Sequence, residues 1–76
     1  MELRPQTLIV AVQCVARRIH ELDKLIDEVD SQEAGQLEEL LVSFDLAAAD
    51  LKKAYAEARE KFADMPDYEQ LAKTGL

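Results

Sequence analysis

A regular apolar repeat in the first third of the chain constrains the fold more than any other feature of the sequence. From residue 8 to residue 29, apolar side chains recur at alternating intervals of four and three positions, as Leu8, Val12, Val15, Ile19, Leu22, Ile26 and Val29. A period of about 3.5 residues keeps one side of an α-helix in contact with a neighbouring helix along its length. Pro5 suits the first turn of such a helix, where its missing N–H removes no hydrogen bond. The repeat therefore predicts a helix over about residues 6–29 that packs against a second helix.

A second repeat with the same alternation follows after a short break. Its members are Leu37, Leu40, Phe44, Ala47, Leu51, Ala54 and Ala58. Asp30 and Glu33 stand three positions apart in the pattern of a capping box, in which the two side chains bond each other's backbone N–H groups. Pro66 ends a helix because it cannot continue the backbone hydrogen bonds. The chain is thus predicted to turn at about residues 30–32 and to form a second helix over about residues 33–63.

The short break between the two repeats determines the topology. A connection of two or three residues between long helices forces the helices to run antiparallel. The predicted fold class is therefore all-α, with residues 1–64 forming an antiparallel two-helix hairpin. Residues 65–76 are expected to form a short helical or mobile C-terminal tail that either folds back on the bundle or stays mobile. Tyr68 and Leu71 give this tail a small apolar face, which is expected to be exposed.

The first predicted helix has more apolar surface than one neighbouring helix can cover. The stretch from Leu8 to Ala16 is apolar at every position except Gln13, and two helices share only one seam. An exposed patch of this size is unfavourable for a monomer, and the core of a single hairpin is thin. We therefore predict a homodimer in which two hairpins form a four-helix bundle. The residues expected in the core and the dimer interface are Leu8, Val12, Val15, Ile19, Leu22, Leu40, Phe44 and Leu51.

The residue types available for chemistry argue against catalysis and against a metal site. The chain has one cysteine and one histidine, Cys14 and His20. A di-iron bundle needs Glu three positions before an inward-facing His, but Arg17 stands there, and residues 27–39 do not fit the calcium-loop pattern. Cys14 lies in the apolar stretch and is expected to be buried and unreactive, whereas His20 is expected to be exposed. The chain is predicted not to be an enzyme and to bind no cofactor or metal.

Charge is distributed unevenly along the chain. Acidic residues outnumber basic residues 16 to 9, which gives a net charge of −7, and no Lys or Arg occurs between Lys24 and Lys52. A field of one sign steers and binds a partner of opposite charge. The predicted docking surface for a basic protein consists of Asp27, Glu28, Glu38, Glu39 and Asp45. The leading interpretation is a non-enzymatic protein-interaction module that acts as a regulator, adaptor or inhibitor; the alternative for these acids is a purely solvated surface.

A second interpretation comes from the layout of the hairpin. Heptads over residues 8–62 and the segment LDKL at residues 22–25, shortly before an acidic turn, resemble the Rop family of plasmid copy-number regulators. Members of that family are short helical hairpins that dimerise into four-helix bundles and bind paired RNA loops. The resemblance implies RNA contact through Arg17, His20 and Lys24. This chain departs from the Rop pattern because that side of the helix has no aromatic residue, and its negative charge opposes nucleic-acid binding.

A third interpretation pairs the apolar first helix with a different helical protein in place of a second copy, as in inhibitor–target and chaperone–cargo complexes. The same apolar stretch is shorter than the roughly 18 residues that suggest a membrane-spanning helix. Arg17 and Arg18 follow it directly, which is atypical of a signal peptide. No membrane association is predicted, and the cytoplasm is the expected compartment.

Overall fold

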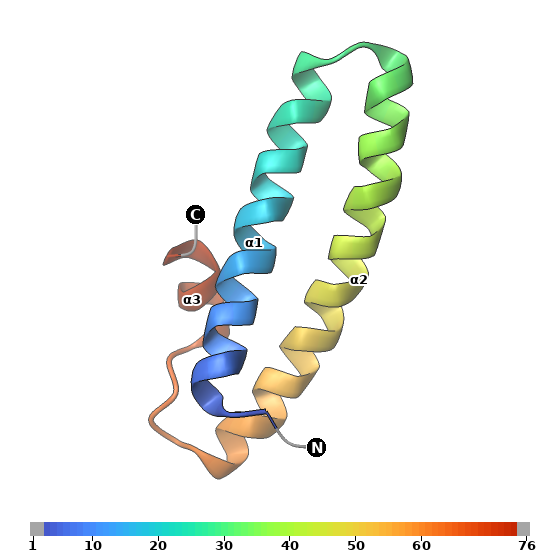
Figure 1. Cartoon of the computed structure of the whole chain (residues 1–76). Helices are drawn as coiled ribbons and strands as arrows, with labels where there is room; N and C mark the ends of the chain where they lie inside the picture. The colour runs from blue at the N-terminus through green and yellow to red at the C-terminus, as the bar shows by residue number, and fades with distance from the viewer. Residues whose placement is uncertain (1–2, 75–76) are drawn as a thin grey trace.

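The computed structural model describes residues 3–74, which form three α-helices and no strand (Figure 1). Helix α1 spans Pro5–Glu28, α2 spans Ser31–Lys61 and α3 spans Tyr68–Thr74. The first two helices pack side by side as an antiparallel hairpin, and α3 folds back beside α1. The predicted all-α hairpin with a short third helical element is therefore confirmed. Residues 75 and 76 of the predicted tail lie outside the described residues, and the dimer stays a prediction.

A two-residue connection joins α1 to α2. Val29 and Asp30 both have extended backbone, and the Asp30 carboxylate accepts a 2.9 Å hydrogen bond from the backbone N–H of Glu33. The carboxylate thus satisfies one of the N–H groups that the start of a helix leaves without a partner, as the spacing of Asp30 and Glu33 predicts. So short a connection brings α2 straight back along α1, and the molecule measures 45 × 24 × 14 Å.

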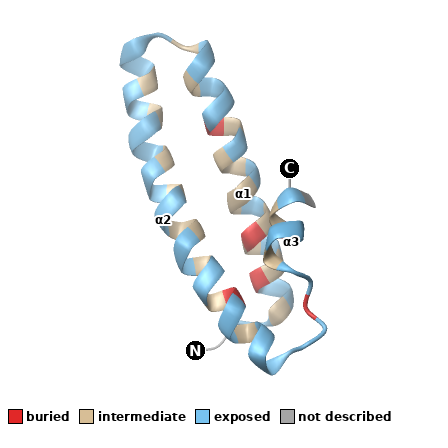
Figure 2. Cartoon of the chain, turned by 180° about the vertical axis from the view of Figure 1, so that it is seen from behind, coloured by how far each residue is buried: buried red, intermediate tan, exposed pale blue. Residues whose placement is uncertain are grey.

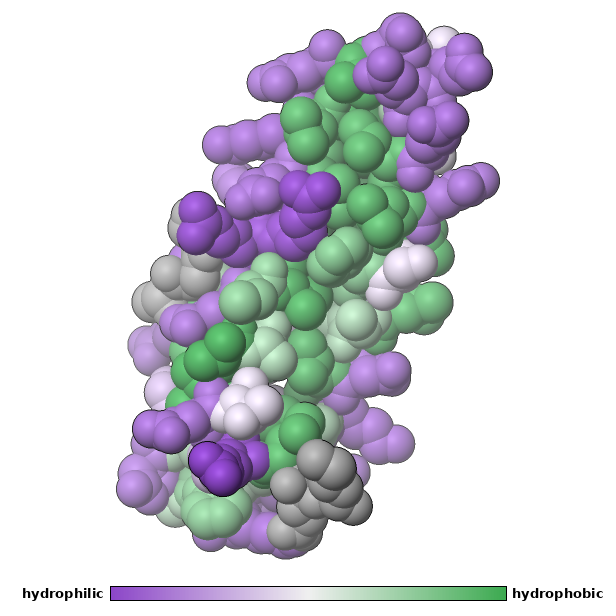
Figure 3. Space-filling model, viewed as in Figure 1, coloured by the Kyte–Doolittle hydropathy of each residue, from purple (hydrophilic) through white to green (hydrophobic). Residues whose placement is uncertain are grey.

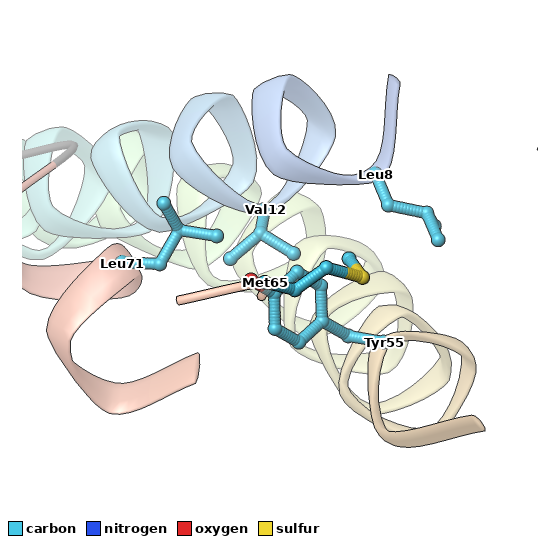
Figure 4. Packing of buried hydrophobic residues seen from close by; sticks show 5 residues of the cluster. All are labelled: Leu8, Val12, Tyr55, Met65 and Leu71. Atoms are coloured by element: carbon cyan, nitrogen blue, oxygen red, sulfur yellow. The ribbon is translucent and has the colours of Figure 1, made fainter. Parts of the chain in front are cut away.

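The core is a narrow line of side chains where the three helices meet. Its main cluster, shown in Figure 4, consists of Leu8, Val12, Tyr55, Met65 and Leu71. Each member is at most 7% exposed, and burying a large apolar side chain contributes about 1.5–3 kcal/mol. Towards the turn, Leu22 is also fully buried, but most of that half of the hairpin is exposed (Figure 2). The apolar stabilisation is therefore concentrated at the end where α3 packs.

The C-terminal tail packs onto the hairpin, so the prediction that Tyr68 and Leu71 form an exposed apolar face is wrong. Leu71 is 5% exposed and Tyr68 is half-buried. The Tyr55 hydroxyl donates a 2.6 Å hydrogen bond to the carbonyl oxygen of Pro66. The rings of Tyr55 and Tyr68 meet edge to face at 5.9 Å, and the Lys52 ammonium lies 5.6 Å from the centre of the Tyr68 ring. These contacts hold α3 and the segment before it against the hairpin.

The first helix is not buried on all sides, and the expectation that Cys14 is buried is wrong. Cys14 is exposed, and Val10 is 58% exposed. Each lies two positions from Val12, which is about 200° around a helix. Because Val12 points into the core, Val10 and Cys14 point away from it. The apolar stretch therefore leaves part of its surface uncovered in a single chain.

Replacing Tyr55 by phenylalanine should loosen the docking of α3. The ring would still fill the core, but the hydrogen bond to Pro66 would be lost. We expect the free energy of unfolding to fall by about 1 kcal/mol, as measured by urea unfolding followed by circular dichroism. The control variant is Tyr68→Phe, which removes a hydroxyl group from a half-buried ring. An equal loss of stability in both variants would contradict a specific contribution from the Tyr55 hydroxyl.

The same hydroxyl group should make stability depend on pH in the alkaline range. Burial raises the pKa of Tyr55 above its ordinary value of 10.0, with Arg59 opposing the rise and Asp67 adding to it. The folded chain therefore holds this proton more tightly than the unfolded chain. Its contribution is fully present below pH 10.0 and is lost as the pH rises through the raised pKa. The difference in unfolding free energy between the wild type and Tyr55→Phe should therefore stay constant up to about pH 10.0 and shrink as the pH rises above it; a constant difference across this range would contradict this linkage.

Candidate functional site

Within residues 3–74, no acidic, basic or histidine side chain is buried, so all of them lie at the surface. In that part of the chain, no three His, Cys, Asp or Glu side chains lie close enough together to hold a metal ion. His20 is exposed. None of the described helices combines the length and the apolar character needed to cross a membrane. The candidate functional residues predicted from charge therefore lie on the surface of the described part of the chain.

The acidic residues predicted as a docking surface are all exposed. Asp27 and Glu28 end α1, while Glu38, Glu39 and Asp45 lie on α2. Glu38 and Asp45 are seven positions apart and share one side of α2, whereas Glu39 is turned about 100° away from Glu38. The structure thus brings Glu38 and Asp45 onto one stripe and places Glu39 beside it.

A charged stripe at seven-residue spacing runs along this side of α2. It consists of Glu38, Asp45, Lys52 and Arg59. The Lys52 ammonium lies 3.6 Å from a carboxylate oxygen of Glu69, and the Arg59 guanidinium lies 3.5 Å from one of Asp67. Both acids belong to α3 or to the segment just before it. The basic half of the charged stripe is therefore already matched within the chain, although such exposed pairs contribute only about 0–1 kcal/mol each.

The short third helix stops before it reaches the acidic half of the charged stripe. Ala72 and Lys73, near the end of α3, line a groove of about 290 Å³ together with Ala48 and Leu51 of α2. Asp45 lies almost one helical turn beyond Ala48. The groove also has charges of both signs around it, from Asp23, Glu69 and Lys73, and His20 lines it as well. The acidic half of the stripe thus begins where the covering helix ends.

The basic residues implied by the Rop resemblance are exposed along α1. They are Arg17, His20 and Lys24. The Arg17 guanidinium lies 3.3 Å from one carboxylate oxygen of Glu21, and the Arg18 guanidinium lies 3.2 Å from the other. Glu21 therefore offsets part of the positive charge that contact with a phosphate backbone would require.

The residues predicted for the core and the dimer interface differ in how far they are buried in the single chain. Those buried within it are Leu8, Val12 and Leu22. Those that are half-buried are Val15, Ile19, Phe44 and Leu51. Leu40 is 40% exposed. Figure 3 shows an apolar strip between α1 and α2 on the face seen in Figure 1, which α3 leaves open.

The sequence prediction missed a set of exposed apolar side chains on α2. Val42 is 57% exposed and Leu46 is 65% exposed, and Ala49 is also exposed. Their spacing of four and three positions places them on one side of the helix. The spacing is visible in the sequence, but it lies outside the seam that predicts packing between the two helices.

Comparison with known proteins assigns the chain to a family. Residues 1–71 match the family described as "T6SS, Immune protein Tsi2-like", and the chain belongs to this family of immune proteins. A relative from Pseudomonas aeruginosa (strain PAO1), named "Immune protein Tsi2", is 52% identical over 71 residues, which are 93% of this chain and 92% of the relative. Membership of an immune-protein family confirms the prediction that the chain is not an enzyme, and this family replaces Rop as the guide to function.

Proposed function

We propose that this chain is an immunity protein that neutralises a toxin of the type VI secretion system (T6SS) by binding to it. The family description and the similarity to an immune protein over nearly the whole chain support this proposal. The surface location of the charged side chains also supports it, because a protein without enzymatic activity neutralises a toxin by occupying its surface. The predicted protein-interaction module thus becomes an inhibitor with a toxin as its partner.

The toxin-binding surface that we propose is the acidic face, defined as Asp27, Glu28, Glu38, Glu39 and Asp45. The observation that supports it best is the charged stripe, whose basic half is paired within the chain while its acidic half lies beyond the end of α3. A toxin surface rich in Lys and Arg would complement this face. Attraction over several ångströms would also speed association, which matters for an inhibitor that must capture the toxin before it acts.

Reversing charge within the acidic face should abolish toxin binding. The test variant is Glu38→Lys with Asp45→Lys, and the matched control is Glu57→Lys with Glu60→Lys, which makes the same change in net charge at exposed positions elsewhere on α2. A toxin and its inhibitor must be inherited together, so the probe is the purified product of the gene adjoining that of this chain. We expect the test variant to lose at least about a hundredfold in affinity by calorimetry.

The same variants should differ in protecting cells. Chain and toxin are co-expressed in the cytoplasm, which is the compartment that we propose for their encounter. Cells with the control variant should grow like those with the wild type, and cells with the test variant should die. Equal protection by both variants would contradict the acidic face as the toxin-binding surface.

We also propose that the chain is a homodimer, in which two hairpins form a four-helix bundle through the open apolar face seen in Figure 3. Leu25 and Leu40 are 37% and 40% exposed in the single chain, and a second hairpin would cover them. Exclusion of apolar surface from water would supply the free energy of association.

Light scattering should therefore give twice the chain mass of 8.6 kDa at micromolar concentration. Replacing Leu25 and Leu40 by glutamate should shift the mass towards that of one chain, because the new charges would be buried in the dimer without partners. A wild-type mass of a single chain would contradict the dimer.

A further inference from the structure

The outer side of α2 holds two of the three most exposed large apolar side chains of the described residues. Leu46 is 65% exposed and Val42 is 57% exposed. They lie on the same side of the helix as Ala49, which is also exposed, and they point away from the seam formed by Phe44 and Leu51. Neither residue contributes to the buried cluster that stabilises the chain. We call Val42, Leu46 and Ala49 the outer patch.

Acidic side chains surround the outer patch. Neighbours on a helix are separated by three or four positions, and at that separation the acids beside Val42 or Leu46 are Glu38, Glu39, Asp45 and Asp50. No Lys or Arg occurs from residue 25 to residue 51. An apolar centre with a charged rim is the arrangement of a protein–protein interface, in which the rim steers the partner and the desolvated centre supplies most of the affinity.

We propose that Val42 and Leu46 are the apolar anchor of the toxin-binding surface, an inference that rests on the proposed function. The partner surface that fits them presents an apolar side chain surrounded by Lys or Arg. The two kinds of contact have separate effects. The acids accelerate association and are weakened by salt, whereas the anchor slows dissociation and is little affected by salt.

The acidic side chains around the outer patch favour the toxin as its occupant over a second copy of this chain. In a symmetric dimer the same patch from each copy would meet, which would bring two acidic rims together. Like charges facing each other across an interface are unfavourable. A partner with a basic rim would instead neutralise the acids while covering Val42 and Leu46.

The test variant replaces Val42 and Leu46 by glutamine, which keeps the helix and the charge unchanged. The control is Val10→Gln, because Val10 is 58% exposed and lies on the other helix. Affinity for the purified toxin is measured by biolayer interferometry at low and high salt, with light scattering of each variant alone. We expect the test variant to bind about thirtyfold more weakly, through faster dissociation and by a similar factor at both salt concentrations. The control should bind like the wild type.

Other results would overturn the anchor. If the wild type binds the toxin and the test variant binds it with the same affinity, Val42 and Leu46 are not the anchor, while the proposed function is unaffected. Absence of toxin binding by the wild type would refute both. A lower mass of the test variant than of the wild type would assign the outer patch to self-association. Should circular dichroism show that the glutamine pair disturbs the helix, Val42→Ala with Leu46→Ala provides the same comparison.

Discussion

The hydrogen bond to the Pro66 carbonyl from the hydroxyl group of Tyr55, whose side chain is fully buried, is the interaction on which the rest of the structure depends. Two helices alone share one seam, and a seam buries too little surface to make a stable small domain. The hydrogen bond brings the chain after α2 back to the hairpin, so that Met65 and Leu71 can close over Leu8 and Val12. The third helix is short, but it converts a pair of helices into a structure with a core.

Docking of α3 also organises the charges on the surface. Asp67 and Glu69 pair with Arg59 and Lys52, so the basic half of the charged stripe is neutralised within the chain. The acidic half keeps its negative charge, because α3 ends before it reaches these residues. The proposed toxin-binding surface is thus the part of the stripe that α3 does not reach.

The hairpin could be predicted from the sequence because its determinants are local and periodic. The apolar repeat that begins at Leu8 specifies the first helix, and the spacing of Asp30 and Glu33 specifies the turn. Both signals come from residues that are close together in the sequence. The docking of α3 could not be predicted in this way, since it depends on a contact between Tyr55 and Pro66 and on a helix too short to show a period. The acidic residues of the candidate site could be predicted from the distribution of charge along the sequence. The exposure of Val42 and Leu46 required the structure, because apolar residues in a helix-forming sequence are equally compatible with a buried position.

The thinness of the molecule, 14 Å along its shortest axis, has a consequence for how the family can diversify. Only a few side chains of the described residues are buried, and these lie almost entirely on the line between the helices. Most positions can therefore change without a large loss of stability, including those of the acidic face and the outer patch. Such a scaffold can acquire specificity for a new toxin by surface substitutions alone, so an immunity protein can follow changes in its target while its fold remains the same.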